Sequence, residues 1–142
     1  QGESPYPAVT LHRCGAGTCL WIAAPLLHTR QYSQQTYLRE ILAQYLPRLV
    51  QAAENLPGSA EVTLLKGTTE DSYMLCIVNL QDELPAIPLH DVRLTLSLPF
   101  LPDAINDAAT GAPVDFQREH GLTTVALPRI DQAAFLVLQP MQ

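Results

Sequence analysis

The sequence is poor in charge, in aromatic residues and in basic clusters, and each shortage disfavours a class of function. Charged residues make up 15% of the chain, aromatic residues 6%, and the eight basic residues are scattered in a chain of net charge −6. A nucleic-acid surface needs a concentrated basic stripe that displaces counterions from phosphates. The longest apolar stretch, residues 20–27, contains Pro25 and is far shorter than the roughly 20 residues that span a bilayer. We therefore expect no nucleic-acid partner and no membrane partner.

Cysteine is also scarce, with three residues that cannot all pair. Cys14 and Cys19 flank a glycine-rich turn, and a hairpin there would set them nearly opposite each other. The odd count and the position of Cys76 inside an apolar run favour free, buried thiols instead. His12, Cys14 and Cys19 do not suggest a zinc site, because the other histidines are dispersed (His28, His90 and His120). We expect neither a metal nor a cofactor.

What the chain does have is apolar content, at 47%, and twelve prolines against seven glycines. The 142 residues suffice for one domain, or for one domain and a fragment of a second. Proline at this frequency, among regular short apolar runs, is typical of turns and strand edges in a β-sandwich. The composition therefore predicts a packed, mainly β protein.

Residues 1–58 are predicted to form a strand–turn–strand–helix unit. Ala8–Arg13 is the first strand, glycines supply the turn, and Thr18–Ala24 is apolar on both sides, as in a strand buried on both faces. Apolar residues then recur at three- and four-residue steps up to Leu49, which predicts an amphipathic helix that starts near Ser33 and kinks at Pro47. The helix is expected to be terminated by Asn55, Pro57 and Gly58.

Residues 59–142 are predicted to form an antiparallel β-sandwich of about seven strands, with turns of proline and glycine between them. Tyr73–Leu80 is apolar on both faces and should be central, with Cys76 as a core thiol. Val92–Leu98 alternates strictly, which places four aliphatic residues inward. The remaining predicted strands are 61–66, 104–107, 114–118, 122–127 and 133–138. The fold class is therefore mainly β with one long helix (α+β).

Two stretches resemble the C-terminal region of certain β-galactosidases and α-fucosidase-like glycoside hydrolases. The first, from Pro7 to Leu26 with its Gly15-Ala16-Gly17 turn, resembles the end of a glutamine-amidotransferase-like (flavodoxin-like) domain. The second resembles the small β-sandwich that closes those enzymes, through 61–64, 77–80, 88–94 and 127–131. Ala16 departs from the pattern, because a basic residue is expected there.

The resemblance implies a non-catalytic accessory domain that supports structure and oligomerisation beside a catalytic barrel. The barrel would carry the catalytic carboxylates, so no catalytic residue can be assigned in this chain, and whether the chain is itself an enzyme stays open. The implied partners are that barrel and further copies of the chain. The compartment also stays open, with the cytoplasm favoured.

Glycoside hydrolysis would need two carboxyl groups on either side of the sugar bond. The acidic residues fall mostly in predicted turns, where Asp bonds the local backbone, and are interpreted as solvated (Glu70, Asp71, Asp82, Glu83, Asp103, Asp107, Asp115 and Glu119). Asp131 is expected to pair with Arg129. The glycines of 15–17 lead into a strand, so a hairpin turn is favoured over a phosphate loop.

A carbohydrate-binding module is the alternative function, and its ligand-binding residues are unknown at this stage. Sugar sites usually display aromatic rings on one face. Trp21 lies in a strand expected to be buried, and Phe100 is expected to be exposed because it follows Pro99 in a connection. The other candidates, Tyr73, Phe116 and Phe135, are expected to fill the core.

Overall fold

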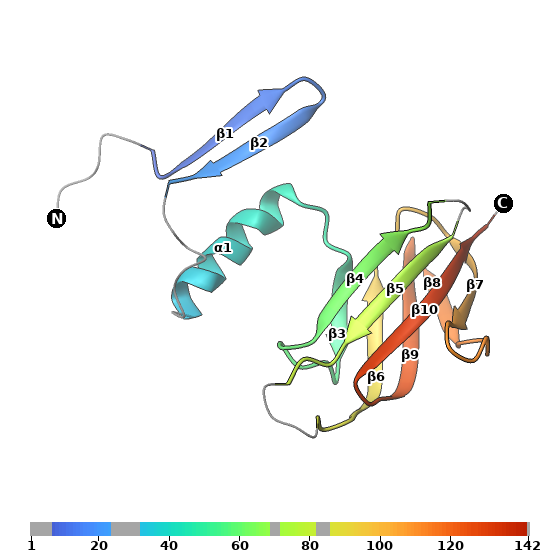
Figure 1. Cartoon of the computed structure of the whole chain (residues 1–142). Helices are drawn as coiled ribbons and strands as arrows, with labels where there is room; N and C mark the ends of the chain where they lie inside the picture. Colours follow the sequence, from blue (N-terminus) through green and yellow to red (C-terminus); the bar gives the residue numbers. More distant parts are fainter. Residues whose placement is uncertain (1–6, 24–31, 69–71, 82–85, 142) are drawn as a thin grey trace. The chain divides into compact units, whose positions relative to one another are not determined.

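The computed structural model describes residues 7–23, 32–68, 72–81 and 86–141 (Figure 1). The chain divides into two compact units, Gln1–Pro47 and Arg48–Gln142. The predicted boundary after residue 58 is therefore moved to Pro47, because residues 50–54 form a strand of the second unit. Whether the first unit belongs to a flavodoxin-like domain stays a prediction.

The first unit begins with the predicted hairpin, formed by β1 (Val9–Cys14) and β2 (Gly17–Ile22). Gly15 takes φ of 59° at the first central position of the two-residue turn, where a type II′ turn requires positive φ. The register pairs Cys14 with Gly17, and it pairs Cys19 with His12. The two cysteines are thus diagonal neighbours rather than opposite each other, and both thiols are free and exposed. Their predicted free state is confirmed, whereas their predicted burial was wrong.

The predicted burial of β2 on both faces was also wrong. Its residues are exposed or half-buried, and Trp21 is 58% exposed. The physical reason is that β1 and β2 form a sheet of only two strands, which covers neither of its own faces.

The predicted helix is present as α1 (Tyr32–Tyr45), close to the expected start at Ser33. Its predicted extension to Leu49 with a kink at Pro47 was wrong, because the helix ends at Tyr45 and the chain turns into β3 (Val50–Glu54). Proline disfavours the helical conformation of the residue before it, which is consistent with an end at this point. Pro25 and His28 lie outside the described residues.

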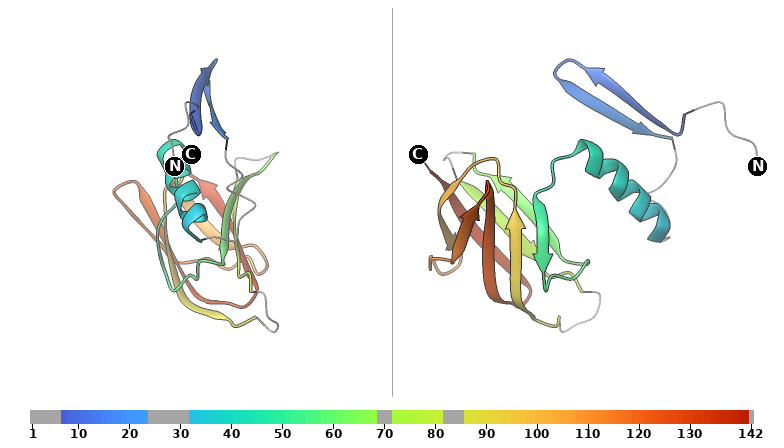
Figure 2. Two further views of the ribbon diagram at one scale, coloured as in Figure 1. Left: turned by 90° about the vertical axis from the view of Figure 1, so that its left-hand side faces the viewer. Right: turned by 180° about the vertical axis from the view of Figure 1, so that it is seen from behind.

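The second unit is an antiparallel β-sandwich of two four-stranded sheets, seen from two sides in Figure 2. One sheet has the order β4-β5-β10-β7, the other β3-β6-β9-β8. All seven predicted sandwich strands are present, and β3 is the eighth. Their bounds are β4 (Glu61–Lys66), β5 (Tyr73–Val78), β6 (Leu89–Leu96), β7 (Pro102–Asp107), β8 (Phe116–Glu119), β9 (Leu122–Ile130) and β10 (Ala133–Pro140).

The core lies between the two sheets and consists of aliphatic side chains. Alternation along β6 places Val92, Leu94 and Leu96 inward, as predicted. The strand β5 is central in its sheet, also as predicted, and contributes the fully buried Leu75 and Ile77. Cys76, however, points with Met74 and Val78 to the opposite face and is half-buried, so its interpretation as a core thiol was wrong.

A buried amide ties three segments of the sandwich together. Asn79 is 5% exposed and follows β5 directly. Its Nδ2 donates to the carbonyl oxygens of Ile87, at 2.9 Å, and Asp131, at 3.0 Å. Its Oδ1 accepts from Nε2 of Gln81 at 2.8 Å. Asn79 therefore links the approach to β6 with the turn between β9 and β10.

Candidate functional site

A groove opens at one edge of the sandwich, where β8 is too short to cover β9. The strand β8 pairs with β9 only through Val125, so the following stretch of β9 has no paired strand on that side. The connection between β7 and β8 crosses here, and its contact with β9 is a long hydrogen bond of 3.4 Å from the Ala126 amide to the Asp115 carbonyl. The groove has a volume of about 640 Å³ and is open to solvent.

The alternation of side chains along β6 is interrupted at Asp91, which lines the groove. Asp91 has φ of 52°, unusual for a residue with a Cβ, and the register places it opposite Pro128. Val92 and Leu89 both pack against the core although they lie three residues apart, so the alternation slips at Asp91. The side-chain amide of Asn55, which also has positive φ, donates to the Asp91 carbonyl at 3.0 Å and supports this conformation.

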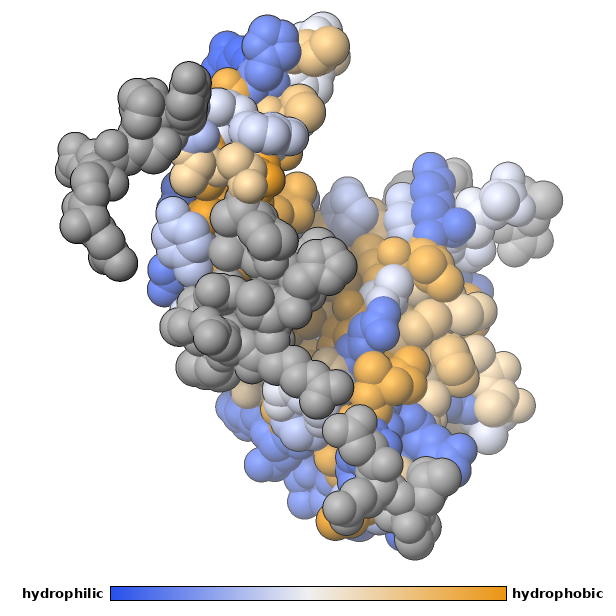
Figure 3. All heavy atoms as spheres, turned by 60° about the vertical axis from the view of Figure 1, so that its left-hand side comes forward, coloured by the Kyte–Doolittle hydropathy of each residue, from blue (hydrophilic) through white to orange (hydrophobic). Residues whose placement is uncertain are grey.

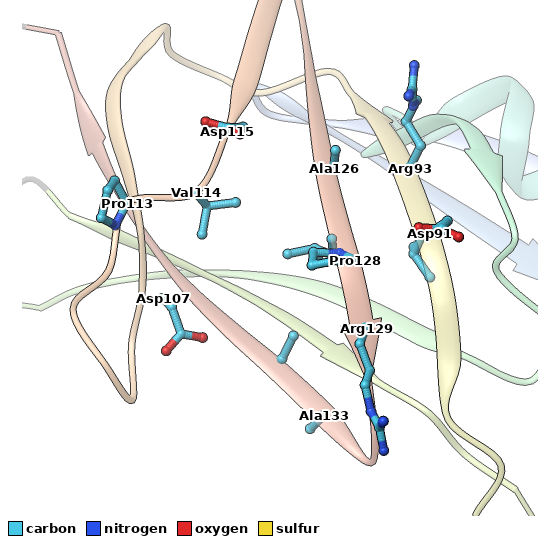
Figure 4. Close-up of a pocket in the computed structure, with 13 residues that line it drawn as sticks. Asp91, Arg93, Asp107, Pro113, Val114, Asp115, Ala126, Pro128, Arg129 and Ala133 are labelled. Atoms are coloured by element: carbon cyan, nitrogen blue, oxygen red, sulfur yellow. The ribbon is translucent and has the colours of Figure 1, made fainter.

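The walls of the groove combine apolar and charged side chains (Figure 4). Val114 and Pro128 lie at its centre, on the crossing connection and on β9. Asp107 and Asp115 lie on the β7–β8 side, and Asp91 lies on β6 across from them. The groove therefore presents carboxylates around a small apolar floor.

Both arginines of the groove are paired with acids outside their own strands, one in the turn that follows β9 and one on β3. Arg129 binds Asp131 through Nε at 2.8 Å and Nη2 at 2.6 Å, which confirms the predicted local pair. Arg93 forms a longer ion pair of 3.9 Å with Glu54 on β3. These pairs are exposed and contribute little to stability, but they offset the positive charge of both arginines. The carboxylates of Asp91, Asp107 and Asp115 remain and make the groove negative.

Asp107 is fixed in place by the turn that it begins. Its Oδ1 accepts from the Thr110 hydroxyl at 2.7 Å, the Thr110 amide at 2.8 Å and the Ala109 amide at 3.1 Å. The hydrogen bonds from the Thr110 hydroxyl and amide, followed by that from Ala109, lower the pKa of Asp107 below its usual 3.8. The carboxylate is therefore ionised and oriented near neutral pH.

A second feature is the apolar outer face of the sheet that contains β4, β5 and β10, here named the outer face. The register places Leu65, Met74 and Val137 in one row across the three strands. The next row contains Thr63, Cys76 and Phe135, and the third contains Glu61, Val78 and Ala133. Leu65 is 50% exposed, Phe135 45% and Met74 37%. Among the residues of these three rows, only Glu61, at one corner, carries a charge. Figure 3 shows hydrophobic residues on the surface of the sandwich.

The aromatic residues only partly follow the sequence expectations. Phe135 lies on the outer face rather than in the core. Phe100 is half-buried rather than exposed, because its ring stacks on Tyr73 with a centroid distance of 4.1 Å. Tyr73 and Phe116 pack against the core as expected. Residues 74, 76 and 78 of β5 belong to the outer face. The sequence could not distinguish this face from the core-facing one, because the residues on both faces of β5 are apolar.

Four of the acidic residues predicted to be solvated lie in the described part of the chain. Asp103, Asp115 and Glu119 are exposed, as expected, whereas Asp107 is partly covered. Glu70, Asp71, Asp82 and Glu83 lie outside the described residues. The structure brings Asp107 and Asp115 to one groove. Sequence spacing did not indicate this groove, because β7 and β8 belong to different sheets and the groove forms only when the two sheets pack together.

Among the described residues, no three histidine, cysteine or acidic side chains come together in a way that could hold a metal ion. In the same part of the chain, no helix is both long and apolar enough to cross a membrane.

Comparison with known proteins identifies the fold. No protein-family model matches the chain, and no curated protein matches its sequence. The chain is similar in structure to α-L-fucosidase isoenzyme 2 from Paenibacillus thiaminolyticus, with a TM-score of 0.59 and 18% sequence identity. The likeness covers 87% of this chain and 21% of the fucosidase chain, so this chain spans about a fifth of that protein. At this identity the likeness shows a shared fold.

Proposed function

We propose that this chain is a non-catalytic accessory part of a larger glycoside hydrolase, and that the outer face packs against another domain of that protein. The proposal rests on the exposed apolar side chains of the outer face. A sheet face with three large, half-exposed apolar side chains in adjacent rows is costly to leave in water. Such faces in stable proteins are covered by another layer.

The fold supports a glycoside hydrolase as the parent. A solved structure with a similar fold is that of an α-L-fucosidase, and this chain corresponds to about a fifth of its length. Most of a protein of that kind would then lie beyond these residues, which leaves room for a catalytic barrel. The sequence resemblance to the C-terminal region of such enzymes points the same way.

The hairpin and helix of the first unit would serve oligomer formation. The register places Leu11 and Leu20 opposite each other on one face of the hairpin, while Trp21 lies on the other face. An isolated two-stranded hairpin is marginally stable, so partners are needed on its faces. We infer that these are strands of a neighbouring sheet or a second copy of the chain.

The test uses the complete reading frame that encodes this segment. A charge is introduced into the outer face by Phe135→Asp, with Leu101→Asp as the matched control, since Leu101 is 49% exposed and lies off the outer face. Thermal unfolding is measured for the whole protein and for residues 1–142 alone, together with hydrolysis of aryl glycosides.

The proposal expects Phe135→Asp to lower the unfolding temperature of the whole protein by several degrees more than that of the isolated chain. The control should shift both equally. It also expects aryl-glycoside hydrolysis by the whole protein and none by residues 1–142. Equal effects of Phe135→Asp in both proteins, or a reading frame without a further domain, would contradict it.

A further inference from the structure

We propose that the groove beside β9 binds a neutral sugar through its free hydroxyl groups. This goes beyond an accessory role, because it gives the sandwich a ligand of its own at a surface distinct from the outer face. The argument uses the volume of the groove, the charge of its rim and the apolar character of its floor.

The groove is of the size that small ligands occupy. Its volume of about 640 Å³ falls within the roughly 300–1,000 Å³ of ligand sites in proteins. It is open along one side, so it suits the end or one edge of a saccharide better than a fully enclosed molecule. One or two sugar rings would fill it.

The charges on the rim select a ligand that donates hydrogen bonds and carries no negative charge. Arg129 and Arg93 are already paired with Asp131 and Glu54. Phosphates and carboxylates would meet the carboxylates of the rim without a free cation to bind them, at a cost of like-charge repulsion. Sugar hydroxyls are donors, and hydrogen bonds from hydroxyl groups to carboxylates are among the stronger ones.

Asp107 is a preorganised acceptor for such a hydroxyl. Its Oδ1 is held by Thr110 and Ala109, which fixes the plane of the carboxylate. The other oxygen, Oδ2, has no hydrogen bond from the described residues. A ligand that binds it does not have to immobilise the side chain first, which lowers the entropic cost of binding.

The apolar floor matches the C–H face of a sugar ring. Pro128 and Val114 lie centrally, and the small Ala126 side chain leaves room above β9. Pro128 also has no amide hydrogen, so the uncovered edge of β9 is a poor template for an added strand from a peptide. The combination of apolar floor and blocked edge favours a sugar over an extended peptide.

The experiment is an NMR titration of the ¹⁵N-labelled full chain with L-fucose, D-galactose, D-glucose and, as a peptide probe, trilysine. We expect at least one sugar to bind with a Kd of about 1–10 mM, which this method detects. The shifted amides should cluster in 107–115, 126–129 and 133–134. Trilysine should give weaker shifts or none.

Two variants locate the site. Asp115→Asn removes one exposed carboxylate of the rim, and Asp103→Asn removes an exposed carboxylate of β7 that does not line the groove. We expect at least fivefold weaker sugar binding for Asp115→Asn and unchanged binding for Asp103→Asn. Dispersed amide spectra for both variants establish that they are folded.

Sugar-induced shifts elsewhere on the chain, or no shifts with any sugar, would overturn the proposal. Tight binding of trilysine without sugar binding would replace the sugar by a basic peptide and overturn it as well. None of these results concerns the outer face. If the groove does not bind sugar, the accessory function is still tested separately by Phe135→Asp in the whole protein.

Discussion

At the scale of single residues, two polar side chains form structural hydrogen bonds, and the surrounding sequence indicates only some of them. Asn79 follows an apolar strand and is buried, yet it serves two carbonyl groups that lie 8 and 52 residues away. Asp107 looks like one more turn residue, but it organises its turn and reaches the groove. The turn contacts of an aspartate can be predicted from its type, whereas the long-range partners of Asn79 cannot.

Replacing Asn79 with leucine should lower the free energy of unfolding by about 1–3 kcal/mol, because the Asp131 carbonyl loses its side-chain donor and Gln81 loses an acceptor while the volume is kept. Urea denaturation of the full chain measures this. The control, Asn106→Leu on β7, removes a side chain without such bonds among the described residues and should change the stability by less than about 1 kcal/mol. Equal effects of the two substitutions would show that the hydrogen bonds of Asn79 do not stabilise the sandwich.

The lowered pKa of Asp107 predicts a specific acid sensitivity. Its pKa in the folded state lies below the 3.8 of an unperturbed group, so its contribution to stability is complete above that pH and is lost as the pH falls through the folded-state pKa. Asp107→Asn should therefore destabilise the chain at pH 6 and have a smaller effect at pH 2.5, as measured by urea denaturation. The exposed Asp103→Asn serves as control. A penalty for Asp107→Asn that is independent of pH would refute this role.

At the scale of elements, the local sequence pattern predicted most strands of the sandwich. It failed where the structure of a segment depends on residues that are distant in sequence. The alternation in 92–98 and the short apolar runs identified seven strands correctly, since the period-two pattern depends only on which face is buried. Residues 50–54 were assigned to the helical unit because the sequence there lacks an alternating apolar pattern, and β3 forms by pairing with β6. The groove was missed for the same reason, since it depends on β8 ending early against β9.

The turn between β8 and β9 provides a prediction at this scale. His120 and Gly121 both have positive φ, as a type I′ turn requires, with Gly121 at 79°. Gly121→Ala should cost about 1 kcal/mol of stability, because alanine is strained in this conformation. Gly58→Ala, at a position in open space without positive φ, should be neutral or slightly stabilising. Urea denaturation of both variants separates backbone strain from side-chain effects, and equal costs would argue against the turn assignment.

At the scale of the whole molecule, the two units differ in how much of their apolar surface they bury. The sandwich buries a core between two sheets, whereas the hairpin exposes Leu11 and Trp21. The resemblance implied further copies of the chain as partners. The sequence pattern misjudged β2 as buried, because burial of an apolar strand on both faces depends on neighbouring strands, and among the described residues β2 pairs with β1 alone.

The first unit is therefore expected to drive self-association of the isolated chain. Residues 1–142 should dimerise at high concentration, and the double substitution Leu11→Ser and Trp21→Ser should make the chain monomeric without loss of the sandwich core. Multi-angle light scattering gives the mass, and circular dichroism shows that the fold is kept. A strictly monomeric wild-type chain at high concentration would speak against this role.

The central claim is that the outer face is covered in a larger protein, and Cys76 reports on it directly. Its thiol lies half-buried in the middle row of that face. In a Cys14→Ser, Cys19→Ser background, the rate of alkylation by iodoacetamide is measured for residues 1–142 and for the complete protein from which they derive. We predict that Cys76 reacts at least tenfold more slowly in the complete protein, because another domain covers it. Equal rates in the two proteins would contradict the claim.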